Sequence, residues 1–183
     1  MHIRPKTMYK GLILIITIIM LCSCGGDVMR TEKEIESLLL NIEKGNLHLT
    51  IYYFSPSKLT LLHVSVNDLV DGGYDYKFSI DDTSLNEHIE LFEKLRSANL
   101  EPAKQKSRID ARIYYVFEDS KSRKIFDVAM WGDNDSIYVN GVEFQWETVF
   151  YEIIRPFFPE DIKEFMDRQC DVIMQDKNLQ PEN

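Results

Sequence analysis

Cysteine is scarce in this sequence, and its scarcity excludes two kinds of architecture. Only three cysteines occur among 183 residues, at positions 22, 24 and 170. A disulfide scaffold and a zinc site with four cysteine ligands both need more than this. The four histidines form no H-E-x-x-H pattern. We therefore predict no metal and no cofactor, and we expect Cys170 to be a buried, unreactive thiol on a C-terminal helix.

Catalytic and nucleotide-binding motifs are also missing. The sequence has no G-x-S-x-G elbow, no Walker loop and no dinucleotide fingerprint. Residues 55–58 have the S-x-x-K spacing of penicillin-interacting enzymes, but the partner motifs S-D-N and K-T-G are absent and Pro56 favours a turn. Residues 133–135 begin like a calcium loop, yet Tyr138 and Phe144 stand where an EF-hand needs Gly and Glu. We predict that both segments are turns.

Positive charge is in the minority. The chain has 21 Lys and Arg against 30 Asp and Glu, for a formal net charge of −9. Proteins that bind nucleic acid need clustered Lys and Arg, and electrostatic docking on anionic lipid needs a basic surface. We therefore predict no nucleic-acid partner and no purely electrostatic attachment to a membrane.

Long hydrophobic stretches are limited to one. Residues 11–21 are apolar except for Thr17, and they follow Arg4, Lys6 and Lys10. This run of roughly a dozen residues is short of the roughly 20 that a spanning helix needs. A basic start, a short apolar stretch and small residues after it are typical of a secretory signal.

The end of this segment, Leu21-Cys22-Ser23-Cys24, resembles the lipobox of bacterial lipoprotein precursors. The resemblance implies cleavage before Cys24 and acylation of its thiol and its amine. Cleavage before Cys22 fits less well, because neither Met20 nor Leu21 is small. Several acyl chains, each contributing about 0.8 kcal/mol per buried CH₂ group, imply lasting attachment to the membrane of the cell envelope. Gly25 in place of Asp implies the outer membrane if the source is Gram-negative.

This interpretation divides the chain into four parts: a signal peptide (1–23), a lipidated tether (24–30), a single domain (31–174) and a polar tail (175–183). Cleavage removes three positive charges and no acid, so the mature chain has a net charge of about −12. Its roughly 160 residues are enough for one domain with a hydrophobic core. Acylation of Cys24 leaves Cys170 without a disulfide partner.

Helices are predicted where apolar residues recur at helical spacing. A capping box from Thr31 to Glu34 opens the first helix, and Gly45 ends it. A second helix covers residues 85–95, a third covers 147–155, and the last begins near Glu160 and carries Ile162, Phe165, Met166 and Ile173 on one face. A capping pattern at Ser65–Asp68 predicts one short helical turn.

Strands are predicted by alternating apolar and polar residues. They cover residues 46–54, 59–64, 74–80, 109–118, 123–131, 136–139 and 142–145. Asn140-Gly141 between the last two is a strong hairpin signal. Consecutive strands joined by tight turns, with helices in separate runs, indicate an α+β fold. We predict a largely antiparallel sheet with a C-terminal meander, packed by N-terminal, central and C-terminal helices.

The hairpin of residues 109–131 suggests a candidate binding surface. A four-residue loop places Glu118 opposite Arg123 and Tyr114 opposite Asp127. One face of the hairpin is then apolar at alternate positions and is interrupted only by Lys124; it holds Ala111, Ile113, Tyr115, Phe117, Phe126, Val128 and Met130. The other face holds charged and aromatic residues that a partner can recognise, namely Arg112, Tyr114, Asp127 and Trp131. The alternative is that another layer covers this face, with Arg112 paired to an acid.

These patterns favour a non-enzymatic, lipid-anchored envelope protein whose domain binds another protein or an envelope component, as an accessory or inhibitory factor. No catalytic residue is assigned. The alternative is a hydrolase of envelope polymers that uses paired carboxylates, such as Asp110, Glu118 or Asp127. A purely structural lipoprotein is a third possibility. A pocket with two convergent carboxylates, one of raised pKa, favours the enzyme, whereas an exposed patch favours binding.

Overall fold

The computed structural model describes residues 26–103, 106–131 and 136–179. Cys24, the lipobox and the calcium-like residues 133–135 therefore lie outside the described residues, and their predicted roles stay predictions. Within the described part of the chain, no helix is long and apolar enough to cross a membrane.

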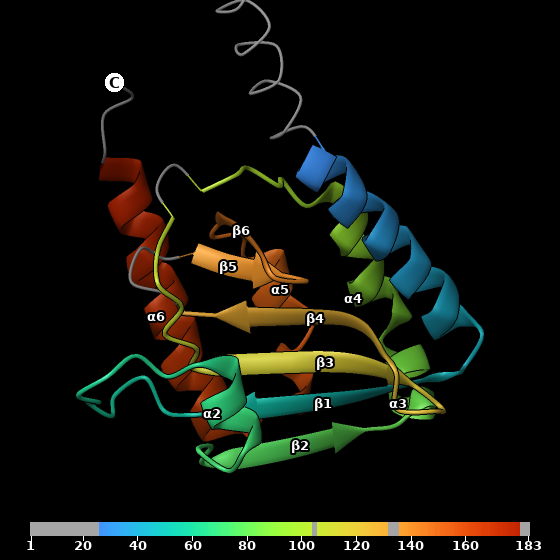
Figure 1. Ribbon diagram of the computed structural model, residues 1–183, viewed down its shortest axis with the longest axis horizontal. Helices are drawn as coiled ribbons and strands as arrows, with labels where there is room; N and C mark the ends of the chain where they lie inside the picture. The colour runs from blue at the N-terminus through green and yellow to red at the C-terminus, as the bar shows by residue number, and fades with distance from the viewer. Residues whose placement is uncertain (1–25, 104–105, 132–135, 180–183) are drawn as a thin grey trace, which may run out of the picture.

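The centre of the molecule is one six-stranded sheet in which every pair of neighbours is antiparallel (Figure 1). Its spatial order is β2-β1-β3-β4-β5-β6. The strands are β1 (Leu47–Tyr53), β2 (Tyr76–Ile80), β3 (Ile113–Asp119), β4 (Lys124–Met130), β5 (Ser136–Val139) and β6 (Val142–Gln145). Strands β3 to β6 follow one another as the predicted C-terminal meander. The predicted α+β class with a largely antiparallel sheet is therefore confirmed.

The helices come in separate runs before, between and after the strands. An N-terminal helix covers residues 26–43 of the described chain. The other helical segments are α2 (Val66–Val70), α3 (Asp82–Glu87), α4 (Ile89–Glu93), η1 (Lys94–Ser97), α5 (Val149–Glu152), η2 (Arg155–Phe157) and α6 (Glu160–Leu179). The predicted helix at 85–95 is thus broken at His88, and the one at 147–155 is shorter than predicted.

The start of the first helix differs from the sequence prediction. Residues 26–30, which we placed in the tether, are already helical, so Thr31 lies inside the helix and does not cap it. Its side chain is fully buried. Glu34, the other half of the predicted capping box, accepts a hydrogen bond of 2.7 Å from Asn140 in the β5–β6 turn. The predicted end is confirmed, because Gly45 adopts φ +64° and donates its N–H to Ile42. At the other end of the chain, α6 continues through residues 175–179 of the predicted tail.

The predicted strand at residues 59–64 does not form. Strand β1 pairs with β2 along one edge and with β3 along the other. No edge of β1 is left for the segment that follows it, which instead forms a loop. The short helix after it is confirmed. In α2 the Ser65 hydroxyl accepts from the Asp68 N–H, and the Asp68 carboxylate accepts from the Ser65 N–H.

The two faces of the sheet carry two separate apolar clusters. The larger joins one face to the N-terminal helix, α4, α5 and α6, and it includes Leu38, Phe92, Tyr115, Phe150 and Met166. Cys170 is buried in this cluster, and burial raises the pKa of its thiol to about 12, as expected for an unreactive thiol. The smaller cluster covers the opposite face beneath α2, and it consists of Tyr52, Leu69, Ala111, Tyr114, Val116 and Ala129. Ala111 therefore lies on the face opposite to the predicted one.

The register of the β3–β4 hairpin is shifted by two residues from the prediction. Tyr114 pairs with Ala129, and Val116 pairs with Asp127. The register then changes at Phe117/Glu118, so that Glu118 pairs with Lys124. Asp119 fixes the turn because its carboxylate accepts the N–H groups of Lys121 and Arg123, each at 2.9 Å. These hydrogen bonds and the Arg123 side chain lower the pKa of Asp119 to about 2. A shift of two residues preserves the faces, which is why Tyr115 and Phe117 are in the core as predicted.

Candidate functional site

The four residues predicted to form an open binding face are not open to solvent as a group. Arg112 and Tyr114 are each only 7% exposed. Asp127 has a side chain that is 13% exposed. The expectation of a solvent-open face is therefore wrong for these residues. The alternative considered from the sequence, a covered face with Arg112 paired to an acid, describes the structure.

Trp131 is separated from the other three. Its backbone has φ +73°, which turns the chain out of the strand conformation of β4. The indole then packs against the larger cluster and lies edge-on to Trp146, with 5.0 Å between ring centroids. Tyr114 belongs to the smaller cluster on the opposite face. The structure therefore does not bring Trp131 and Tyr114 together.

Asp127 and Tyr114 form an internal polar contact. The Tyr114 hydroxyl donates to Asp127 at 3.1 Å, and the Lys124 ammonium donates to the same carboxylate oxygen at 2.9 Å. The Asp127 N–H donates to the Asn140 side chain at 2.8 Å. Burial, together with the charge of Asp127, raises the pKa of Tyr114. These contacts connect β3, β4 and the β5–β6 turn, and they engage one carboxylate oxygen of Asp127, whereas its other oxygen, Oδ1, is buried without a hydrogen-bond partner among the described residues.

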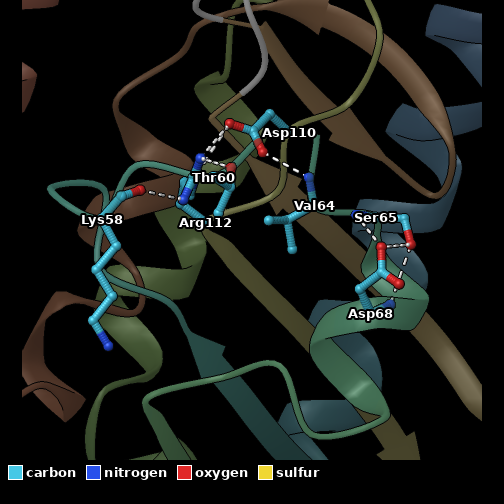
Figure 2. Close-up of polar contacts among 7 residues, drawn as sticks. All are labelled: Lys58, Thr60, Val64, Ser65, Asp68, Asp110 and Arg112. Carbon is cyan, nitrogen blue, oxygen red and sulfur yellow. Dashed lines mark hydrogen bonds and ion pairs between the residues drawn. The ribbon is translucent and has the colours of Figure 1, made fainter. Parts of the chain in front are cut away.

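Arg112 holds a loop against the sheet. We name residues 58–64 the leucine strap. The Arg112 guanidinium donates to the Lys58 carbonyl at 3.1 Å and to the Thr60 hydroxyl at 3.0 Å (Figure 2). It also forms an ion pair with Asp110, with N–O distances of 2.7 and 3.1 Å. The guanidinium carbon lies 5.1 Å from the centroid of the Phe54 ring, within the range of a cation–π contact.

The far end of the leucine strap is fixed by Asp110. The second oxygen of its carboxylate accepts the Val64 N–H at 2.8 Å (Figure 2). The Val64 carbonyl accepts the Ala111 N–H at 2.8 Å. The capping box of α2 begins at the next residue, Ser65. Both ends of the strap are thus bonded to the chain that leads into β3.

The middle of the leucine strap is apolar and unburied. Leu59, Leu61 and Leu62 are 101%, 104% and 79% exposed. Burial of a leucine side chain typically stabilises a protein by about 1.5–3 kcal/mol, and these three gain little of it within the described chain. The sequence also has no acidic residue between Glu43 and Asp68, although the chain as a whole is acidic. Three exposed leucines on a loop that is fixed at both ends form an apolar protrusion.

The turn that precedes the strap confirms the prediction for residues 55–58. The Lys58 N–H donates to the Ser55 carbonyl at 3.0 Å. The Lys58 ammonium forms an ion pair with Asp75, and the same carboxylate accepts the Ser55 N–H at 2.9 Å. The Ser55 hydroxyl contacts that of Ser57 at 2.8 Å. Lys58 is therefore committed to Asp75 and does not act on Ser55 as the base of an S-x-x-K enzyme.

Two recesses have linings within the described residues. One, of about 550 Å³, lies between the N-terminal helix and residues 95–100, with Ile35, Leu40 and Leu95 in its lining. The other, of about 430 Å³, lies between the base of the leucine strap and α6. We name it the basal recess, and its lining is Tyr53, Ser55, Lys58, Asp75, Tyr76, Asp161, Ile162 and Phe165.

The carboxylates considered for a hydrolase do not line either recess. Asp110 is bonded to Arg112 and to the Val64 N–H. Asp127 is bonded to Lys124 and Tyr114. Asp75 and Asp161 do share the basal recess, but the pKa of Asp75 is lowered and not raised. Burial acts to raise its pKa, yet the hydrogen bonds from Lys58 and Ser55 outweigh burial and hold the pKa below its usual value.

The described residues contain no group of three His, Cys, Asp or Glu side chains placed to hold a metal ion. The histidines in the described part of the chain have different neighbours. His48 contacts the Ser79 hydroxyl at 3.0 Å, and His88 lies edge-on to Phe157 with 5.3 Å between ring centroids. His63 is on the exposed leucine strap.

Sequence reasoning missed the leucine strap because its apolar residues satisfied the pattern of a strand. The signal that was available is the acid-free stretch from residue 44 to residue 67, which is longer than one strand needs. The comparisons with known proteins add no assignment: a scan against protein-family models, a search of curated proteins and a search of solved structures each found no match.

Proposed function

We propose that this protein is a lipid-anchored component of the bacterial envelope, without enzymatic activity, that binds a partner protein through the leucine strap. The observation that carries the proposal is the exposure of Leu59, Leu61 and Leu62 on a loop clamped by Arg112 and Asp110. Isolated exposed leucines are ordinary on protein surfaces, but three on one fixed loop are typical of a binding element.

The fixed strap favours binding because the loop already has an ordered conformation before the partner associates. Immobilising a side chain or loop at an interface costs about 0.5–1.5 kcal/mol for each rotamer-rich side chain. The hydrogen bonds at Lys58, Thr60 and Val64 reduce the part of this cost that comes from the backbone. Burial of three leucines in an apolar pocket adds about 5–9 kcal/mol before association costs are subtracted.

The position of the strap favours a protein partner over the anchoring bilayer. The anchor predicted at Cys24 precedes the described N-terminal helix by two residues. The described start of that helix lies at the top of Figure 1, whereas the loop between β1 and α2 projects from the lower left. A membrane at the start of the helix then leaves the strap directed elsewhere. We therefore propose an envelope protein with a concave apolar pocket as the partner.

Crosslinking of the acylated full-length chain in its own envelope tests this proposal. The variant replaces Leu59, Leu61 and Leu62 with serine, and it is expected to lose the crosslinked partner species while remaining folded. The control replaces Leu40 and Val172 with serine, because these residues are exposed by 49% and 54% but lie far from the strap in sequence. The control is expected to retain the crosslinks. Equal crosslinking by both variants contradicts the proposal.

Two further measurements separate the anchor and the bilayer from the partner. Cys24→Ser is expected to release an unlipidated chain from the membrane. Flotation of that released chain with phosphatidylethanolamine–phosphatidylglycerol vesicles is expected to fail. Flotation that depends on the three leucines would instead assign the strap to the bilayer and refute a protein partner.

A further inference from the structure

The basal recess combines an exposed aromatic ring with fixed hydrogen-bonding groups. From this combination we infer that it binds one or two rings of a neutral saccharide. The inference does not depend on the partner proposed for the leucine strap. The volume of about 430 Å³ is near the lower end of the roughly 300–1,000 Å³ typical of small-ligand sites.

The aromatic part of the site is Tyr76 on the edge strand β2. Its side chain is 51% exposed and lines the recess. The ring is stacked on Phe78, with 6.2 Å between centroids and 18° between planes, and it lies 6.3 Å from the ring of Tyr53. These neighbours hold Tyr76 in place. A sugar ring presents C–H groups on one face, and these pack against the electron-rich face of such an aromatic ring.

The polar part of the site is already ordered. Asp75 is held by the Ser55 N–H and the Lys58 ammonium. Ser55 adds a hydroxyl, and Tyr53 adds a phenol whose pKa is raised by burial and by the charges of Asp75 and Asp161. Hydroxyl groups of a sugar both donate and accept hydrogen bonds, and the lining offers both carboxylate acceptors and ammonium or hydroxyl donors.

The charges of the lining select a neutral ligand. It contains two carboxylates, Asp75 and Asp161, and one ammonium, Lys58, which is already paired with Asp75. The unpaired excess is negative, so phosphate and carboxylate ligands are repelled. The hydrogen bonds from Lys58 and Ser55 also hold the pKa of Asp75 below its usual value, which does not favour a role for Asp75 as the general acid of glycoside hydrolysis. The recess is therefore suited to holding a neutral saccharide.

Titration of the purified full-length chain in detergent tests the inference. The probes are two neutral trisaccharides, tri-N-acetylchitotriose and maltotriose, and one anionic trisaccharide, trigalacturonic acid. Saturation-transfer NMR detects contact, and calorimetry gives the Kd. We expect at least one neutral probe to bind, and the anionic probe to bind about tenfold more weakly or not at all. No binding of either neutral probe, or tighter binding of the anionic one, overturns the inference.

Variants assign any binding to the recess. Tyr76→Ala is expected to raise the Kd by about tenfold, and Tyr76→Phe, which keeps the ring, is expected to restore it. Asp161→Asn is expected to narrow the preference for neutral over anionic probes. The matched control is Lys77→Ala, because the neighbouring Lys77 points to the other side of β2, over the ring of Tyr52. Unchanged binding by Tyr76→Ala, or equal loss with Lys77→Ala, contradicts the assignment.

A last comparison keeps this inference distinct from the proposed function. The triple serine variant of the leucine strap leaves Lys58 and the lining of the recess in place. It is expected to bind the neutral probe with an unchanged Kd even though it loses the partner. Loss of saccharide binding in that variant would show that the strap itself contacts the sugar, and it would refute a site confined to the recess.

Discussion

Replacement of Arg112 with methionine is the most direct test of how the leucine strap is held. Methionine keeps an unbranched apolar stem, although a shorter one, and it removes the ion pair with Asp110 and the hydrogen bonds to Lys58 and Thr60. Asp110 remains in this variant, and its carboxylate no longer has the positive charge of Arg112 beside it. Removing one partner of a buried ion pair typically costs about 3–5 kcal/mol.

The structure places the expected loss at the lower end of that range. The side chain of Arg112 is 9% exposed, but that of Asp110 is 20% exposed and keeps the Val64 N–H as a partner. We therefore expect Arg112→Met to lower the free energy of unfolding by about 3 kcal/mol. A domain of this size then loses about 6–12 °C in Tm.

A matched variant separates burial from ion pairing. Arg123 contacts Asp119 through the same two nitrogens, Nε and Nη2, at 2.7 and 2.6 Å, but its side chain is 71% exposed. Arg123→Met is expected to cost less than about 1 kcal/mol, as exposed ion pairs do. Adding Asp110→Asn to Arg112→Met is expected to recover about 1–2 kcal/mol of the free energy of unfolding, because it removes the unpaired charge of Asp110.

Urea unfolding measures these free energies, and hydrogen exchange locates the change. We expect the Val64 amide, which donates to Asp110, to lose more protection in Arg112→Met than the amides of β3 do. If Arg112→Met costs no more than Arg123→Met, or if Val64 keeps its protection, Arg112 does not clamp the strap. In that case the exposed leucines belong to a loop without a fixed shape.

Two other predictions concern groups away from the strap. Thr31→Val is expected to raise the free energy of unfolding, measured in urea, by about 1 kcal/mol, because the buried Thr31 hydroxyl has no hydrogen-bond partner among the described residues. If Thr31 were a helix cap, the same substitution would instead lower the free energy of unfolding by about that amount. Burial acts to raise the pKa of Glu143, but hydrogen bonds from Ser107 outweigh burial and lower the pKa below 4.5. Ionised Glu143 therefore stabilises the folded state above pH 4.5, and this stabilisation is lost as the pH falls through the pKa of the folded state. The Tm difference between wild type and Glu143→Gln should therefore be largest at neutral pH and shrink below pH 4.5, and a difference independent of pH contradicts this assignment.

Local sequence patterns were sufficient wherever a short segment decides its own conformation. Asn140-Gly141 forms the predicted turn, with φ angles of 48° and 78°. Gly45 ends the first helix, and the apolar face of the last helix is buried at Ile162, Met166 and Ile173. These features need only a few neighbouring residues, because turn geometry and helical periodicity are local properties.

The same patterns failed where a distant part of the chain decides. Leu59 to Val64 reads as a strand, but both edges of β1 are occupied by β2 and β3. Trp131 was assigned to the face of Tyr114, but its positive φ moves it to the opposite cluster. The irregularity at Phe117/Glu118 shifted the hairpin register, and no residue type at these positions predicts such an irregularity.

The sequence by itself determined the fold class and the buried thiol. The anchor at Cys24 stays a prediction from the sequence, because that residue lies outside the described part of the chain. Only the tertiary structure revealed the clamp formed by Arg112 and Asp110, the exposed leucines that it presents and the recess at their base. The physical reason is that exposure depends on what covers a segment. The three leucines of the strap stay exposed, and the residues that fix the strap in this position, Arg112 and Asp110, lie more than forty positions away in the chain.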